Sequence, residues 1–328
     1  MIRRIRANVG SGVKLLNSRI LRRAFCRVRE NHGCAGADGV SLQDFQQNLE
    51  VRLEELRGGV AEESYFAWPL RKIEVEKRPG SPERRTLLVP AVRDRVLQTA
   101  AAMYLEPILE PEFEECSFAY RRGRSVRMAV ERVWSFFQQG YRWVLDADID
   151  SFFDSVDREI VLSRLAPLVP DETVLRLVRL WLDYAVWDGL QLTRPALGLP
   201  QGAVVSPMLA NLCLDAFDEK LLQAGLKLVR YSDDFVVLAK SRRAAEEARE
   251  LTEEALAQLR LRLHQGKTRV VRASDGFRFL GVIFLKDLLL EPYRRGPKRS
   301  KVLFSAPPLP ERFFPSSERR RLRRYRSV

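Results

Sequence analysis

The stretch that decides the fold is LVRYSDDFVVL, residues 228–238. Apolar residues at both ends flank a polar centre, which is the pattern of a β-hairpin whose bend carries Asp233 and Asp234. An Asp-Asp pair is most often a solvated turn, because aspartate tolerates turn geometry. Taken alone, the stretch predicts two strands and a bend.

A second acidic cluster, Asp146, Asp148 and Asp150, lies at the end of an apolar strand expected over 143–149. Alternation along a strand places Asp146 and Asp148 on one face. Carboxylates that converge in a partly buried place repel one another, and a divalent cation relieves that repulsion. Carboxylate oxygens suit Mg²⁺, and two such ions can clamp the attacking and leaving oxygens of a phosphoryl transfer. Together the two clusters indicate a polymerase or a nuclease.

The composition fits a nucleic-acid partner. The chain has 328 residues, 46% of them apolar, and a net charge of +13, most of which lies in residues 292–328. A basic tail of this kind is either a solvated surface or an arm that binds phosphates. No apolar run is long enough to span a bilayer, and no secretory signal is seen, so we expect a cytoplasmic protein. The cysteines show no zinc or disulfide spacing.

Hydropathy patterns predict an α+β fold, with helices packed on one side of a small sheet. Ser41 is expected to cap a helix, and Ser206 to cap another with Pro207 in its first turn. Helices are also expected over the first thirty residues and over 92–105, 157–187 (two helices) and 244–263. Strands are expected over 66–75, 85–89, 143–149, 228–238 and 277–285.

Several ordered motifs add to the two acidic clusters. They are AGADGVS (35–41), RTLLVPAVRDR (85–95), FAYRRGRS (118–125), DIDSFFD (148–154), GLPQG (198–202) with Ser206-Pro207 and Ala210-Asn211, YSDD (231–234), GKT (266–268) and GFRFLG (276–281). In this order the chain resembles the reverse transcriptases, especially the bacterial group II intron-like lineage, over roughly residues 10–290.

The resemblance implies a right-hand polymerase with its thumb reduced or absent. It divides the chain into an N-terminal and fingers region (1–95), a fingers–palm connection (96–142), a palm (143–290) and a Pro-rich basic linker or tail (291–328). A reduced thumb would hold the duplex weakly, so low processivity is expected.

The resemblance also implies the metal site. Asp148, Asp233 and Asp234 correspond to the ligands of two Mg²⁺ ions, for which Mn²⁺ is a possible substitute. Asp146 and Asp150 are auxiliary, and Asp150 is not counted as a ligand. Lys267 corresponds to a lysine that protonates the leaving pyrophosphate; its alternative is a solvated lysine.

Other positions correspond to substrate contacts. Phe153 resembles the gate that rejects a 2′-hydroxyl, and Gln201 a contact to the nucleotide or template; their alternatives are core packing and a turn residue. Lys77 and Arg85 resemble the triphosphate-binding residues, and Tyr231 lies beside the substrate.

Nucleic-acid contacts are expected at Arg121, Arg122 and Arg124, at the primer-grip residues Phe279, Leu280 and Gly281, and in the tail at Arg319, Arg320 and Arg321. A core strand with a glycine bulge is the alternative for the primer grip.

The expected partners are an RNA template, a DNA or RNA primer and dNTPs, with no membrane. The chain most resembles the reverse transcriptases of CRISPR adaptation, which implies the spacer integrase complex as a partner. The alternatives are an orphan intron-derived enzyme, a phage-defence polymerase, an RNA polymerase on the same palm, and a catalytically silent nucleic-acid-binding subunit.

Overall fold

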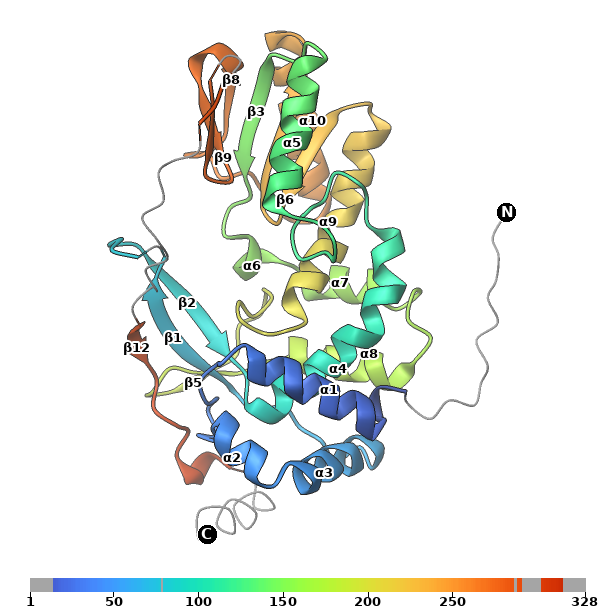
Figure 1. Ribbon diagram of the computed structural model, residues 1–328, viewed down its shortest axis with the longest axis vertical. Coiled ribbons are helices and arrows are strands. Elements are labelled where there is room, and N and C mark those ends of the chain that lie inside the picture. The colour runs from blue at the N-terminus through green and yellow to red at the C-terminus, as the bar shows by residue number, and fades with distance from the viewer. Residues whose placement is uncertain (1–13, 78, 286–287, 291–301, 315–328) are drawn as a thin grey trace.

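The computed structural model describes residues 14–77, 79–285, 288–290 and 302–314. They form two lobes, drawn one above the other in Figure 1. No helix in these ranges is both long and apolar enough to cross a bilayer.

The upper lobe is built on an antiparallel sheet in the order β6-β7-β3-β8. Its strands are β3 (Trp143–Asp148), β6 (Lys227–Tyr231), β7 (Asp234–Ala239) and β8 (Arg269–Arg272). The predicted hairpin of residues 228–238 is confirmed, since β6 and β7 pair with Tyr231 opposite Asp234. The alignment of β3 with β7 sets Asp148 opposite Asp234, which brings the two acidic clusters together.

Helices cover both faces of this sheet. One face, with Leu145 and Val237, packs on α9 (Ser206–Gln223) and α10 (Arg242–Gln258). The other, with Val144 and Val236, packs on α5 (Val126–Gln138) and on the hairpin of β9 (Phe277–Phe279) and β10 (Val282–Leu285). The prediction of helices on one side was therefore wrong, because alternate residues of the central strands are apolar on both faces.

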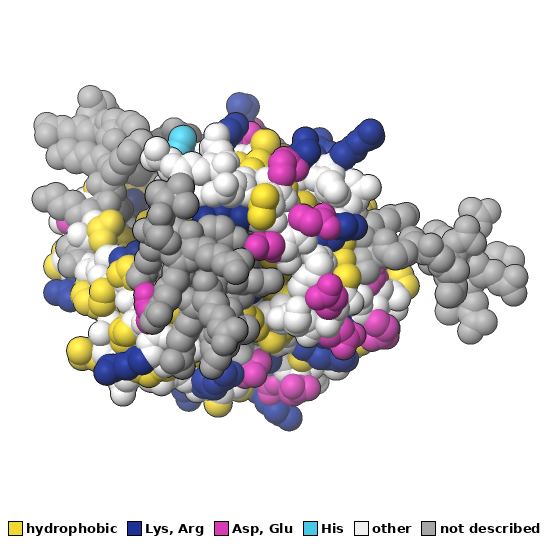
Figure 2. Space-filling view, turned by 90° about the horizontal axis from the view of Figure 1, so that it is seen from below, with side chains coloured by type: hydrophobic (Ala, Val, Ile, Leu, Met, Phe, Trp, Pro, Cys, Tyr) yellow, Lys and Arg dark blue, Asp and Glu magenta, His cyan; other side chains and the backbone are white. Residues whose placement is uncertain are grey.

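The lower lobe carries the fingers hairpin of β1 (Leu70–Glu76) and β2 (Arg84–Val89), which pair from Arg71 opposite Val89 to Glu76 opposite Arg84. Packed beside it are α1 (Ser18–Glu30), α2 (Leu42–Gln47), α3 (Leu49–Ala61) and α4 (Val92–Leu109). The predicted cap at Ser41 is confirmed, since its side chain and that of Asp44 form a reciprocal capping box. Seen from below in Figure 2, acidic and basic side chains are interspersed on the visible part of this end.

The remaining elements connect the lobes or extend the sheets. They are η1 (Lys14–Leu16), η2 (Glu110–Glu112), α6 (Phe152–Ser155), α7 (Arg158–Leu165), α8 (Glu172–Leu182), β4 (Val186–Trp187), β5 (Leu192–Thr193), η3 (Ala273–Asp275), β11 (Leu288–Leu290), β12 (Val302–Ser305) and η4 (Glu311–Phe313).

The start of α9 differs from the prediction by one residue. The helix begins at Ser206, so Val205 is the N-cap and Pro207 lies in the first turn. The Ser206 hydroxyl is buried and makes no hydrogen bond, and the Val204 amide donates to Gln98 Oε1 at 2.9 Å instead. A side chain of α4 thus anchors the chain just before α9, and no hydroxyl cap is used.

The segment predicted as a linker or tail is in part structural. Strand β12 pairs with β1, and Ala306, Leu309 and Phe314 are buried against fingers residues such as Trp68 and Trp187. The Phe314 ring meets Trp68 edge-on, with centroids 4.7 Å apart, and the Trp187 indole N–H donates to the Pro307 carbonyl at 2.7 Å. Residues 302–314, called the strap below, therefore belong to the fingers lobe, and no thumb is seen within the described residues.

Two buried aspartates support the fingers lobe. Asp94 accepts hydrogen bonds from the Tyr65 hydroxyl at 2.8 Å and from the Trp68 amide at 2.9 Å, and Asp38 accepts from the Val40 amide at 3.2 Å. Burial, followed by the charge of Asp94, raises the pKa of Asp38 from 3.8 to about 7. Protons are therefore held by the folded state at pH values where the unfolded chain has lost them.

We expect the wild-type free energy of unfolding to fall as the pH rises from about 4 to about 7, since in this window the folded state binds the extra proton. The Asp38→Asn variant keeps an oxygen acceptor for Val40 and has no carboxylate to ionise. It should match the wild type near pH 4 and exceed it at pH 8 by roughly 1–3 kcal/mol. Urea unfolding at both pH values measures this, and a stability difference that does not grow with pH would contradict it.

Candidate active site

The hairpin predicted to be catalytic turns through two residues, Ser232 and Asp233, between β6 and β7. Ser232 adopts a left-handed conformation (φ 64°), which a tight hairpin bend of this kind requires. The Ile149 amide donates to the Asp233 carbonyl at 3.3 Å, so the bend is fixed to the end of β3. The structure thus brings Asp148, Asp233 and Asp234 together at one end of the sheet.

These carboxylates sit in a place that disfavours their charge. Burial, together with the charges of Asp146, Asp148 and Asp233, raises the pKa of Asp234 to about 7. Burial is also the main cause of the raised pKa values of Asp146 and Asp233. Like charges held together this way are stabilised by a cation.

The cations that the described residues provide are Lys267 and Arg269. The Lys267 ammonium donates to Asp148 Oδ2, and Arg269 Nη2 lies 3.0 Å from Asp146 Oδ2. Within the described ranges, no three acidic, His or Cys side chains are arranged to hold a metal ion. The donor chemistry nevertheless fits Mg²⁺, because Asp148, Asp233 and Asp234 provide hard carboxylate oxygens at the same end of the sheet.

A short turn carries Lys267 to the carboxylates. The His264 amide donates to the Asp148 carbonyl at 2.8 Å, and the Lys267 amide donates to the His264 carbonyl at 3.0 Å. Lys267, the predicted proton donor, therefore lies beside Asp148, a predicted metal ligand. The hydrogen bond to Asp148 raises the pKa of Lys267.

Phe153 lies on α6, next to Phe152. Phe152 is buried, whereas Phe153 is half-buried, and their rings meet edge-on at 5.4 Å. The Leu199 amide donates to the Phe153 carbonyl at 2.6 Å. A Cβ at Gly198 (φ 95°) would lie 2.8 Å from that carbonyl oxygen, so this close approach needs glycine.

Gln201 lies where the palm loop meets the fingers. The Leu88 amide on β2 donates to the Gln201 carbonyl at 2.7 Å, and a Cβ at Gly202 (φ 120°) would lie 2.8 Å from the Leu88 carbonyl oxygen. The backbone of this loop therefore packs directly against β2 at Leu88.

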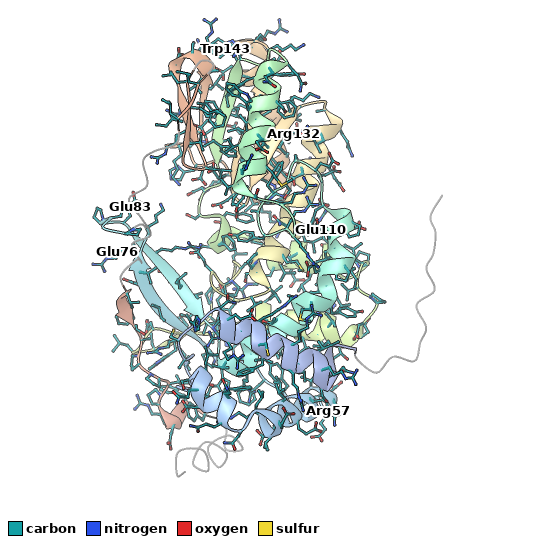
Figure 3. All side chains as sticks on the ribbon, in the orientation of Figure 1. Arg57, Glu76, Glu83, Glu110, Arg132 and Trp143 are labelled. Atoms are coloured by element: carbon teal, nitrogen blue, oxygen red, sulfur yellow. The ribbon has the colours of Figure 1, made fainter. Side chains whose placement is uncertain are left out.

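The predicted triphosphate-binding residues lie on the fingers hairpin. Arg85 is exposed on β2 opposite Val75. Lys77 lies at the hairpin tip, where its ammonium is 3.0 Å from the Glu83 carboxylate. Figure 3 labels Glu76 and Glu83 at this tip, which projects away from the body of the lobe. Lys77 is thus engaged with an acid at the tip and not with the carboxylate cluster.

The arginines of residues 121–124 separate into two kinds. Arg122 is exposed, and Arg124 lies over the Phe118 ring and donates to the Glu115 carbonyl at 3.2 Å. The Arg121 guanidinium is only 4% exposed and is 2.8 Å from Glu110. It also donates to the carbonyls of Phe113, Glu114 and Ser117. The prediction that Arg121 contacts nucleic acid is therefore corrected: its donors face protein acceptors.

The predicted primer-grip residues form the turn between β9 and β10. Leu280 (φ 50°) and Gly281 (φ 86°) are both left-handed, as a two-residue turn of the primed type requires. Phe279 is fully buried in the core beneath α5, so Leu280 and Gly281 are the accessible part of the motif. Arg319, Arg320 and Arg321 lie outside the described residues.

The comparison with protein families decides what this site belongs to. The family described as "Reverse transcriptase (RNA-dependent DNA polymerase)" matches residues 75–284. The chain belongs to the reverse transcriptase family. The matched range of this reverse transcriptase includes the second strand of the fingers hairpin (β2), the acidic cluster, Phe153 and Lys267.

Curated relatives confirm the predicted lineage. Protein YkfC of Escherichia coli (strain K12) is 31% identical over 285 residues, which cover 75% of this chain and 74% of YkfC. Group II intron-encoded protein LtrA of Lactococcus lactis subsp. cremoris is 29% identical over 198 residues, which cover 60% of this chain and 31% of LtrA. The reverse transcriptase thus spans less than a third of LtrA.

Solved structures add the polymerase fold. A telomerase from Candida tropicalis superposes with a TM-score of 0.53 at 11% identity, covering 72% of this chain and 59% of that one. A chain of a Cas6-RT-Cas1–Cas2 complex is 28% identical, with a TM-score of 0.47, and the match covers 74% of this chain and 40% of that one. The telomerase superposition confirms the α+β polymerase fold expected from the sequence.

Two residues behind the hairpin were not singled out by the sequence reasoning. Arg230 and Asp218 form a fully buried ion pair beneath the turn. The available signal was a charge in the middle of an apolar strand, together with an acid in the apolar helix that follows Ser206-Pro207. Each is a charged residue in a largely apolar element, and the hydropathy pattern does not show that the two form a pair.

Proposed function

We propose that this reverse transcriptase copies an RNA template into DNA by adding dNTPs to a DNA or RNA primer. The observation that carries the proposal is the meeting of Asp148, Asp233 and Asp234 at one end of an antiparallel sheet, close to Lys267. Carboxylates kept together against their repulsion fit a metal-dependent phosphoryl transfer.

Asp148, Asp233 and Asp234 would hold the metal ions. Two bound Mg²⁺ ions, or Mn²⁺ in their place, would stabilise charge on the attacking and leaving oxygens. Lys267 would give its proton to the leaving pyrophosphate, which requires that it release Asp148 when substrate binds. Arg85 and Lys77 would hold the triphosphate, and Lys77 would exchange Glu83 for phosphate oxygens.

The other predicted residues select and align the substrates. Phe153 would meet the sugar at C2′, and Gln201 and Tyr231 would line the nucleotide site. Arg122, Arg124 and the Leu280–Gly281 turn would contact the nucleic acid, as would the basic residues 319–321. The proposed regions are the N-terminal and fingers region (1–95), the fingers–palm connection (96–142) and the palm (143–290). In the segment that follows, the strap packs with the fingers.

We further propose that the enzyme works in the cytoplasm in CRISPR spacer acquisition, beside a spacer integrase. This setting rests on the resemblance of residues 229–241 and 276–281 to the reverse transcriptases of CRISPR adaptation. An intron-derived or phage-defence role would use the same chemistry.

Primer extension tests the activity. The purified chain is given an RNA template and a labelled primer, with dNTPs or rNTPs and with Mg²⁺ or Mn²⁺, in the presence and absence of a neighbouring integrase. We expect DNA products, and their lengths with and without the integrase measure how much a partner adds to the grip on the duplex. Nucleic-acid binding without synthesis under every condition would indicate a silent binding subunit instead.

A further inference from the structure

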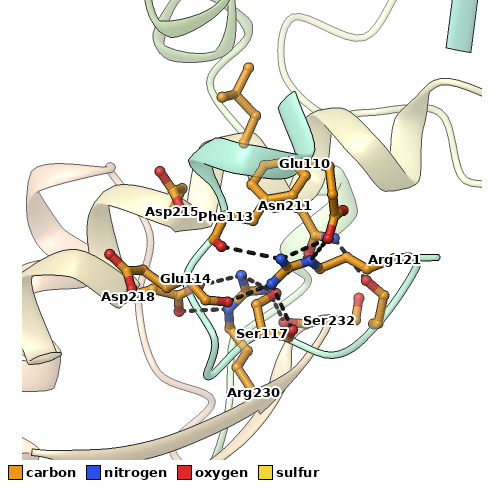
Figure 4. A network of polar contacts seen from close by, with 12 residues as sticks. Glu110, Phe113, Glu114, Ser117, Arg121, Asn211, Asp215, Asp218, Arg230 and Ser232 are labelled. Carbon is orange, nitrogen blue, oxygen red and sulfur yellow. Dashed lines mark hydrogen bonds and ion pairs between the residues drawn. The ribbon is translucent and has the colours of Figure 1, made fainter. Parts of the chain in front are cut away.

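Arg230 is a buried arginine directly behind the catalytic turn. It lies on β6 next to Tyr231, and alternation along the strand points its side chain toward α9, away from the face that carries Asp234. Figure 4 shows its guanidinium among Asp218, Asn211, Ser117 and Ser232. Its side chain is 1% exposed and that of Asp218 is fully buried.

Every N–H of the Arg230 guanidinium has an acceptor. Nε and Nη2 donate to the two oxygens of Asp218 at 2.7 and 2.5 Å. Nη2 also donates to the Ser117 hydroxyl at 2.9 Å, and Nη1 donates to Asn211 Oδ1 at 3.1 Å. The fifth bond runs from Nη1 to the Ser232 carbonyl at 3.1 Å. A guanidinium has five N–H donors in a fixed plane, so this set leaves it a single orientation.

The bond to Ser232 reaches the active site. The Ser232 carbonyl belongs to the peptide unit that leads directly into Asp233. Ser232 is in the left-handed region, which a residue with a side chain occupies at a cost. The Arg230 guanidinium holds the carbonyl in that orientation, and so sets the direction from which the Asp233 side chain leaves the turn.

The partners of Arg230 are themselves fixed. Asp218 and Asn211 lie seven residues apart on α9, which places them on the same side of the helix. The side-chain Nδ2 of Asn211 donates to the Ala119 carbonyl at 2.8 Å, and this bond orients the side-chain oxygen Oδ1 of Asn211 toward Arg230. The Arg230 amide also donates to the Cys116 carbonyl at 2.8 Å. Arg230 is therefore held from α9 and from the 116–119 segment at once.

A role in stability alone accounts poorly for this arrangement. The desolvation of a buried ion pair costs about as much free energy as the attraction between its charges contributes. Well-packed apolar residues of similar volume therefore often give the same stability. What apolar residues cannot do is donate to the Ser232 carbonyl.

We propose that Arg230 is a positioning residue for Asp233, and that Asp218 and Asn211 orient Arg230 for this task. The inference deepens the proposed polymerase function and rests on it for the role of Asp233. The Arg230 guanidinium donates only to protein acceptors, so it would act through the turn and not on the substrate or the metal.

The neighbouring Arg121 provides a matched control. Arg121 pairs with Glu110 and donates to the Ser117 carbonyl at 3.0 Å, so it is also a buried arginine with one acidic partner in the same region. Within the described residues its guanidinium donates to Glu110 and to the carbonyls of Phe113, Glu114 and Ser117, and not to the catalytic turn. Glu110→Gln should therefore weaken a partly exposed ion pair of the same region without disturbing Asp233.

The experiment compares Arg230→Lys with Glu110→Gln. Thermal unfolding measures stability, EPR measures Mn²⁺ affinity, and single-nucleotide extension measures kcat and KM. A lysine has a single ammonium group in place of the planar guanidinium, so it cannot bind both Asp218 and the Ser232 carbonyl in the way that Arg230 does. We expect Arg230→Lys to lose roughly 10–100-fold in Mn²⁺ affinity or kcat, the size seen when groups that orient metal ligands are removed. Its affinity for an RNA–DNA duplex should stay unchanged, and Glu110→Gln should lose only stability.

Asp218→Asn is the second variant if Arg230→Lys does not fold. The asparagine would keep an oxygen acceptor for Arg230 but would carry no charge. We therefore expect smaller losses of Mn²⁺ affinity or kcat than for Arg230→Lys. Equal losses in the Glu110→Gln protein, or wild-type Mn²⁺ affinity and kcat in a folded Arg230 or Asp218 variant, would overturn the positioning role. A wild-type protein that binds Mn²⁺ and makes no DNA would overturn the proposed function alone, since Mn²⁺ affinity still tests the positioning of Asp233.

Discussion

Asp233→Asn is expected to abolish primer extension while the protein stays folded. The substitution preserves the size of the side chain and removes one of the charges that would bind the metal ions. The loss of a carboxylate ligand should raise the barrier by roughly 4 kcal/mol or more, which is about a thousandfold in rate.

The same change should leave the metal-free protein as stable as the wild type, or more stable. Asp233 is buried beside Asp148 and Asp234, so removing its charge removes a repulsion. Extension rates and thermal unfolding of one preparation measure both effects. Loss of activity together with a large loss of stability would show instead that the carboxylate supports the fold.

Asp150→Asn serves as the neighbouring control. Asp150 follows β3, its carboxylate is 3.6 Å from the Arg262 guanidinium, and it is outside the proposed ligand set. The variant should extend primers at the wild-type rate, and an equal loss at both positions would argue against the specific role of Asp233.

Phe153→Ala is expected to relax the choice between dNTPs and rNTPs. The half-buried ring contacts Phe152 edge-on, and the hydrogen bond from the Leu199 amide fixes the backbone that carries it. A ring fixed under the sugar rejects a 2′-hydroxyl through a clash, and an alanine leaves space for it. We expect the ratio of kcat/KM for dNTP over rNTP to fall by roughly 10–100-fold.

Single-nucleotide incorporation with dCTP and CTP on one template measures this ratio. Phe152→Leu is the control, because the buried Phe152 ring contributes to the core and its change should lower stability without altering the ratio. An unchanged ratio in Phe153→Ala would mean that the ring is a packing residue.

The sequence predicted the acidic hairpin well because local pattern determines it. Apolar runs on both sides of Ser232-Asp233 leave a two-residue bend as the compact solution, and a polar strand end brings Asp148 to it. The second helical layer was missed because a strand that is apolar on both faces looks the same as one with a single buried face and a few exposed apolar residues.

Two further errors have the same origin in composition. The strap carries three prolines and lies between two basic stretches of the sequence. Its apolar side chains Leu309 and Phe314 become core residues only through packing in the fold, Phe314 against the distant Trp68. Arg121 belongs to a basic run, so its charge predicted a surface contact. Only the fold reveals that Glu110 and three carbonyls surround it.

The strap also affects how the chain folds. Arg71 on β1 donates to the Ala306 carbonyl, a contact between residues 235 positions apart in the sequence. The whole palm lies between them, so on the ribosome the first fingers strands are made long before the strand that completes their sheet. Contacts of such high sequence separation form late and slowly, and an unpaired strand edge is prone to aggregation while it waits. The edge of β1 should therefore be the point at which a chaperone is most needed during synthesis.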